Sequence, residues 1–125
     1  MAYPATSSAA LIADMRAELQ RIAALPADAP QGLPGVFYTD PSFFEYECQT
    51  ILRRGWQCLG RADEIPEEGD YYTIQILNEP LIVVRTGGEI RVLSNVCRHR
   101  GMPVAEGAGT AKRFICSYHA WTYAL

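Results

Sequence analysis

The two histidines of this chain each follow a cysteine at the spacing of metal ligands, and this pattern restricts the fold more than any other feature of the sequence. The first pair is Cys97-x-His99 and the second is Cys116-x-x-His119, with sixteen residues between them. The 125 residues contain no other histidine. A Ser-His-Asp triad, an HExxH zinc site or a two-histidine iron site would each have to use these two side chains. The chain therefore has at most one histidine-based site, which we expect two loops to form.

Each Cys/His pair supplies one thiolate and one imidazole, and two kinds of metal centre use that set of four ligands. Zinc would bind all four on one tetrahedral ion. A Rieske [2Fe–2S] cluster would place two cysteines on one iron and two histidines on the other. Zinc sites usually pair cysteine with cysteine and histidine with histidine, whereas both pairs here are mixed. The mixed pairs favour the binuclear cluster, since each loop can then reach both irons, and a structural zinc-binding module is the weaker alternative.

The N-terminal part of the sequence has the pattern of a helix followed by a linker. Apolar residues recur at three- and four-residue steps over 7–25, which predicts an amphipathic helix with a serine cap at position 7 or 8. Three prolines and two glycines in 26–35 predict an irregular connection. We therefore expect residues 1–35 to form an N-terminal helix and linker, and residues 36–125 to form the domain that carries the ligand pairs.

A second helix is predicted where Asp40 is followed by Pro41, because an aspartate cap and a proline in the first turn are typical of a helix start. This helix should stop before Gly55. Its predicted apolar face carries Phe44, Cys48 and Ile51.

After Gly55 the sequence changes to short segments rich in β-branched and aromatic residues, separated by turn sequences. This texture predicts an antiparallel sandwich or small barrel, so the fold class is mainly β with N-terminal helices. The segment 100–109 is predicted to be a loop, because it holds three glycines and a proline. The predicted strands are 56–61, 71–77, 81–85, 90–94 and 113–116, another is expected to begin at Thr122, and the predicted turns are 78–80 and 86–89.

Charge and hydropathy exclude several classes of protein. The net charge is −3 and the isoelectric point about 5.3, which argues against nucleic acid or an anionic membrane as the main partner. No apolar run approaches the roughly 20 residues of a membrane span. Charges at Asp14, Arg16 and Glu18 interrupt the stretch where a signal peptide would be apolar. We therefore expect a cytoplasmic protein, in which Cys48 and Cys58 stay reduced as buried thiols.

The ligand loops and their surroundings resemble the Rieske signature of the α subunits of ring-hydroxylating non-haem iron oxygenases. The resemblance rests on the segments 97–101 and 116–121, with support from Gly55-Trp56 and 94–97, and it covers about residues 36–125. It implies a Rieske-type antiparallel β-sandwich with a two-loop [2Fe–2S] subdomain. Ala120 stands where this family commonly has glycine, and a positive φ at that position would cost about 1 kcal/mol. The resemblance assigns the cluster ligands, in both the cofactor-binding and the metal-binding sense, to Cys97, His99, Cys116 and His119.

The resemblance also implies a role in electron transfer within an oxygenase. In that family the cluster receives electrons from a reductase or ferredoxin and passes them to a mononuclear non-haem Fe(II) that activates O₂. Both histidines are already used here, so we expect the catalytic domain to lie outside this chain and the 125 residues to be inactive alone. We expect the N-terminal part of an α subunit, ending inside its Rieske domain, whose full-length form is a homo-oligomer, a trimer. A stand-alone Rieske ferredoxin-like electron carrier is the alternative.

Two further expectations concern the substrate and the reduction potential. The substrate pocket would belong to the other domain, so aromatic acids and quaternary amines both stay open, as do mono- and dioxygenation. Respiratory Rieske proteins add two bridging cysteines and a serine that donates to the cluster, and the matching positions here are Met102, Tyr118 and Trp121. We therefore predict a potential at the low end of the Rieske range, near about −150 mV. We also expect the Tyr123 hydroxyl to donate a hydrogen bond to a cysteine sulfur.

Overall fold

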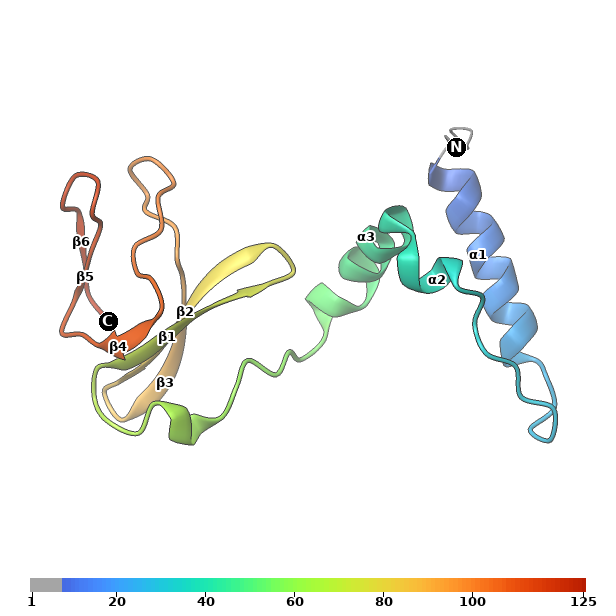
Figure 1. Ribbon diagram of the computed structural model, residues 1–125, viewed down its shortest axis with the longest axis horizontal. Coiled ribbons are helices and arrows are strands. Elements are labelled where there is room, and N and C mark those ends of the chain that lie inside the picture. The colour runs from blue at the N-terminus through green and yellow to red at the C-terminus, as the bar shows by residue number, and fades with distance from the viewer. Residues whose placement is uncertain (1–7) are drawn as a thin grey trace. The chain divides into compact units, whose positions relative to one another are not determined.

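The chain folds into two compact units, Met1–Trp56 and Gln57–Leu125, in a computed structural model that describes residues 8–125 (Figure 1). The sequence placed the boundary after residue 35, whereas the structure divides the chain after Trp56. The reason is packing, because the segment 36–50 forms helices that bury Phe37 and Phe43 against Met15 of the first helix. No helix among the described residues is long and apolar enough to cross a membrane.

The first unit is built on helix α1, Ser8–Ala23, followed by the short helix α2, Val36–Thr39, and helix α3, Pro41–Thr50. The prediction of a helix over 7–25 is confirmed over most of its length, while its cap candidate at position 7 lies outside the described residues. Met15, Phe37 and Phe43 form the buried cluster of this unit. The rings of Phe37 and Phe43 meet edge to face at a centroid distance of 5.0 Å.

Helix α3 starts where the sequence predicted, but the face that it buries differs from the predicted apolar face. The Asp40 carboxylate accepts hydrogen bonds from the backbone N–H of Ser42 and Phe43, at 2.9 and 3.0 Å. Phe43 and Cys48 are buried, whereas Phe44 is 51% exposed and Ile51 61% exposed. The predicted face of Phe44, Cys48 and Ile51 is therefore correct only at Cys48. A single 3₁₀ turn, η1 Leu52–Arg54, follows the helix.

The second unit is built on a four-stranded antiparallel sheet with the strand order β3-β2-β1-β4 (Figure 1). A separate two-stranded ribbon pairs β5 with β6. The expected mainly-β antiparallel fold with N-terminal helices is confirmed. The strands are β1 Asp70–Ile76, β2 Glu79–Thr86, β3 Glu89–Ser94, β4 Ala108–Thr110, β5 Phe114–Ile115 and β6 Thr122–Tyr123, and a 3₁₀ turn, η2 Ala62–Glu64, precedes them.

Two hairpin turns set the register of the sheet. The β2–β3 turn is made by Gly87 and Gly88, both with positive φ, as the sequence predicted. The β1–β2 turn is made by Leu77 and Asn78, with φ of 49° and 67°. It lies one residue earlier than predicted, because Glu79 already pairs with Ile76 in the ladder.

The ribbon packs on the sheet and so holds the ligand loops in place. Ile82 and Val84 of β2 form a buried cluster with Phe114 of β5, and Tyr123 of β6 packs against it. Phe114 also meets Tyr71 of β1 edge to face at 5.2 Å. The ligand-bearing segment between β5 and β6 is thereby fixed relative to the sheet.

One strand prediction and one loop prediction failed for the same physical reason. Residues 56–61 lie outside the strands, and the Trp56 side chain is fully exposed, although their composition predicted a strand. Conversely, Ala108–Thr110 forms strand β4 at the end of the predicted loop 100–109, because it pairs with Asp70–Tyr72 of β1. A strand requires a partner, and composition alone does not reveal that partner.

Candidate metal centre

The first loop, between β3 and β4, is closed by two backbone hydrogen bonds around Cys97. The Cys97 N–H donates to the carbonyl of Met102 at 2.8 Å, and the Gly101 N–H donates to the carbonyl of Cys97 at 2.9 Å. Gly101 has a φ of 72°, in the left-handed region that favours glycine. His99 lies two residues after the cysteine, at the exposed tip of this loop.

The second loop, between β5 and β6, repeats this backbone frame. The Cys116 N–H donates to the carbonyl of Trp121 at 2.8 Å, and the Ala120 N–H donates to the carbonyl of Cys116 at 2.9 Å. Ala120 occupies the position equivalent to the glycine of the first loop and has a φ of 56°. Ala120 therefore has the positive φ that costs an alanine about 1 kcal/mol. The offset of the histidine differs, since His119 lies three residues after its cysteine and His99 two residues after its own.

A buried asparagine closes the base of the first loop. The side chain of Asn95 donates from Nδ2 to the carbonyl of Ala105 at 2.8 Å. Its Oδ1 accepts from the N–H of Val104 and of Ala105, at 2.8 and 2.9 Å. Asn95 is the buried polar residue of the described core, at 6% exposure. Sequence reasoning did not give it a role, because its partners lie nine and ten residues further along the chain and no local pattern indicates them.

The two sulfurs lie on the buried side of the loops. Cys97 is 3% exposed and Cys116 2% exposed. The hydroxyl of Tyr123 lies 3.1 Å from the Cys97 Sγ and accepts a hydrogen bond from the backbone N–H of Arg98, also at 3.1 Å. The hydrogen bond with Tyr123 lowers the pKa of the Cys97 thiol, and hydrogen bonding with Cys116 lowers it further. The same bond raises the pKa of Tyr123. These distances allow the predicted hydrogen bond from the Tyr123 hydroxyl to a cysteine sulfur.

The two imidazoles lie together on the exposed side. The rings of His99 and His119 are 4.6 Å apart at their centroids and meet at 70°. The ring of Trp121 lies parallel to His99, at 5.0 Å and 5°. Tyr118 contacts the ring of His119 at 3.9 Å and 39°. The tryptophan on the imidazole was not predicted from the sequence.

The donor set fits a cluster that takes two ligands of one kind on each iron. The four predicted residues come together as a buried pair of thiols and an exposed pair of imidazoles. Within the part of the chain that the structure describes, no group of three or more His, Cys, Asp or Glu side chains could hold a single metal ion. A Rieske-type binuclear cluster takes two protein ligands for each iron, and two thiols and two imidazoles are brought together here.

The other two cysteines lie outside this arrangement, and neither forms a disulfide. Cys48 is buried in the first unit, as predicted. Cys58 is exposed, which corrects the expectation of a buried thiol. It belongs to the irregular segment before β1.

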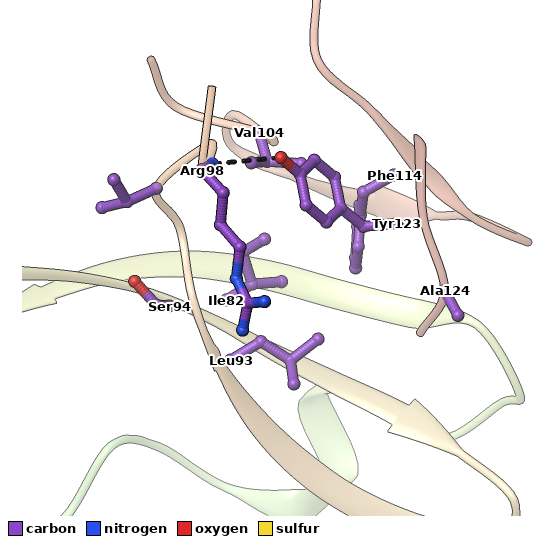
Figure 2. A pocket seen from close by; sticks show the side chains of 9 residues that line it. Ile82, Leu93, Ser94, Arg98, Val104, Phe114, Tyr123 and Ala124 are labelled. Carbon is purple, nitrogen blue, oxygen red and sulfur yellow. Dashed lines mark hydrogen bonds between the residues drawn. The ribbon is translucent and has the colours of Figure 1, made fainter. Parts of the chain in front are cut away.

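An apolar pocket of about 310 Å³ lies beside Tyr123 (Figure 2). Figure 2 shows the Arg98 side chain extending along this pocket toward Leu93, while its backbone N–H is bonded to the Tyr123 hydroxyl. The tyrosine ring therefore lines the pocket while its hydroxyl reaches the sulfur of Cys97.

The sequence model described as the Rieske [2Fe-2S] domain matches residues 55–125. The α subunit of biphenyl 2,3-dioxygenase from Rhodococcus jostii is 46% identical over 88 residues, which are 69% of this chain and 19% of that subunit. Naphthalene 1,2-dioxygenase from a Rhodococcus species superposes with a TM-score of 0.74 at 37% identity, covering 88% of this chain and 24% of that one. A quaternary ammonium Rieske monooxygenase superposes at 0.73 and 35% identity, covering 78% and 27%. The chain thus spans about a fifth to a quarter of the length of these relatives.

Proposed function

Because this chain belongs to the Rieske [2Fe-2S] domain family, we propose that it binds a [2Fe–2S] cluster through Cys97, His99, Cys116 and His119 and serves as the electron-transfer domain of an O₂-dependent oxygenase α subunit. The observation that carries the proposal is the pair of loops with one backbone frame. They bring two buried thiols and two exposed imidazoles to one place.

The chain's own residues would hold and tune such a cluster. When bound, the cluster supplies reversible one-electron chemistry. Cys97 and Cys116 would ligate one iron, and His99 and His119 the other. The Tyr123 hydroxyl, 3.1 Å from the Cys97 sulfur, would donate to the metal-bound thiolate, and burial of both cysteines keeps water from the sulfurs. The exposed imidazoles are where a redox partner can approach.

Similarity to oxygenase subunits supports the wider role. Relatives with this domain are named as a biphenyl dioxygenase, a naphthalene dioxygenase and a quaternary ammonium monooxygenase. We propose that a reductase or ferredoxin reduces the cluster and that the electron passes to a mononuclear iron site of the same assembly, a homo-oligomer. The description of one relative includes inter-subunit electron transfer, which supports the oligomer. Both aromatic and quaternary ammonium substrates are compatible with these relatives.

Metal analysis of the purified 125-residue chain tests the cluster. We expect equimolar iron and acid-labile sulfide, a visible spectrum that bleaches on reduction, and an EPR signal in the reduced state. A colourless protein containing stoichiometric zinc would overturn the proposal in favour of the zinc module. The coding sequence then separates the oxygenase subunit from the stand-alone carrier. An oxygenase subunit requires a continuation into a domain with two histidines and one carboxylate as iron ligands.

A further inference from the structure

The face-to-face contact between Trp121 and His99 joins the two ligand loops through their side chains. His99 belongs to the first loop and Trp121 to the second, and their rings are 5.0 Å apart and within 5° of parallel. The separation is that of an aromatic pair in attractive contact. A residue of one loop therefore covers the face of a proposed iron ligand of the other.

The backbone frame fixes the position from which the indole extends. The Trp121 carbonyl accepts the hydrogen bond of the Cys116 N–H, and the preceding Ala120 has the positive φ that turns the chain. The equivalent position of the first loop is Met102, which accepts the same bond from Cys97 but has no ring. The two loops therefore differ in this respect, since only the second loop carries a ring at this position.

The two imidazoles are consequently held in different ways. Within residues 8–125 no hydrogen bond reaches the His99 ring, and the parallel indole together with the edge of His119 fixes its plane. The His119 ring instead has a tilted contact with Tyr118 of its own loop and the edge contact with His99. Removing the indole would therefore release His99 and leave the surroundings of His119 largely intact.

We propose that Trp121 is a positioning residue that sets the plane of the His99 imidazole and retains that ligand on its iron. The inference rests on the proposed cluster and goes beyond it, because it assigns to a non-ligand side chain the orientation of one particular ligand. An imidazole free to rotate about its side-chain bonds leaves the metal more readily than one held in the ligating orientation. Stacking restricts that rotation without forming any bond to the metal.

The test compares the cluster-loaded 125-residue chains carrying Trp121→Leu and Trp121→Phe with wild type. Leucine keeps apolar volume without a ring, and phenylalanine keeps a smaller ring. Trp56→Phe is the matched control, since the Trp56 side chain is fully exposed. Pulsed EPR of the reduced protein measures the ¹⁴N couplings of the two histidines, and the decay of the visible spectrum in a chelator measures ligand retention.

We expect Trp121→Leu to change one of the two ¹⁴N couplings and to lose its cluster about fivefold faster, the factor that corresponds to one stacked pair. Trp121→Phe should be intermediate and Trp56→Phe should match wild type. If the leucine variant does not fold, the phenylalanine variant provides the same comparison with a smaller effect. Couplings and decay rates equal to wild type in a loaded variant would overturn the inference, and so would equal changes at both histidines. A wild-type chain that binds no cluster would instead overturn the proposed function.

Discussion

The Tyr123 hydroxyl lies between the Sγ of Cys97 and the backbone N–H of Arg98, at 3.1 Å from each. The N–H can only donate, so it occupies the acceptor side of the hydroxyl and directs the phenolic proton toward the sulfur. A metal-bound thiolate can only accept, which gives Tyr123 one consistent role as its donor.

Removing this donor should make the reduction potential more negative. A hydrogen bond to a ligand sulfur favours the reduced cluster, whose negative charge is larger. Tyr123→Phe should therefore lower the midpoint, on the order of tens of millivolts, since about 59 mV corresponds to a tenfold change for a one-electron couple. Protein-film voltammetry at neutral pH measures both proteins, and wild type is expected near about −150 mV. A wild-type midpoint above about +100 mV would contradict the oxygenase assignment.

The proposed ligand set predicts which cysteines and histidines are needed for the visible absorption of the cluster. Substitution of any one of Cys97, His99, Cys116 and His119 should abolish the visible spectrum, because one of the two irons would lose one of its two protein ligands. Cys58→Ser should leave the spectrum unchanged, since that thiol is exposed, and Cys48→Ser should also keep it. Absorption spectra of the folded variants, with circular dichroism as the folding check, decide the matter. Loss of colour in a folded Cys48 or Cys58 variant would mean that the ligand set is wrong.

The two loops offer a reciprocal stability test at equivalent positions. Ala120 and Gly101 both have positive φ, which an L side chain adopts at a cost of about 1 kcal/mol. Ala120→Gly should therefore raise the melting temperature, by roughly 4–8 °C for a domain of this size. Gly101→Ala should lower it by a similar amount. Among the described residues, no atom beyond the two chain neighbours of Gly101 lies within 4 Å of the added Cβ, so the effect reports the backbone. Calorimetry that gave the same sign for both variants would contradict the argument.

Protonation of Asp70 should make the sheet less stable in acid. Its carboxylate accepts from the Thr110 hydroxyl at 2.6 Å and from the Glu67 N–H at 3.0 Å, which links β1 to β4. These bonds hold the pKa of Asp70 below its ordinary value of 3.8. The stabilisation is therefore complete above that value and is lost as the pH falls through the lowered pKa. Asp70→Asn should reduce the melting temperature at pH 7 and converge with wild type near about pH 2. Thr110→Val should give part of the same effect, and a difference that stays constant with pH would exclude the carboxylate as its source.

The 125-residue chain should consume no O₂ with any substrate, even with a reductase present. The reason is the count of histidines, because none remains for a two-histidine iron site once His99 and His119 bind the cluster. An oxygen electrode checks this, with cluster reduction followed in the same sample to prove that electrons arrive. Substrate-dependent O₂ uptake would show that the histidines are assigned wrongly.

The sequence was most informative where the signal was local. The Asp40 cap, the Gly87-Gly88 turn and the two Cys/His pairs depend on neighbouring residues, and the structure has each of them where the pattern predicted. The fold class followed from the density of short strands and turns.

Features that depend on distant partners could not be predicted in the same way. Strand β4 exists because β1 pairs with it, and Phe43 rather than Phe44 is buried because Met15 and Phe37 are present to receive it. The stack of Trp121 on His99 joins residues of two loops that only the packing of the ribbon on the sheet brings together. No spacing rule in a single sequence describes such contacts.

The one-sided exposure of the four proposed ligands would give electron exchange a direction. Cys97 and Cys116 face the protein interior, while His99 and His119 face solvent. Electron tunnelling weakens steeply with distance, so a partner bound over the histidines would exchange electrons far faster than one bound behind the sheet with equal affinity. A binding constant alone therefore does not identify a productive partner of this domain, and the orientation of the complex decides the rate.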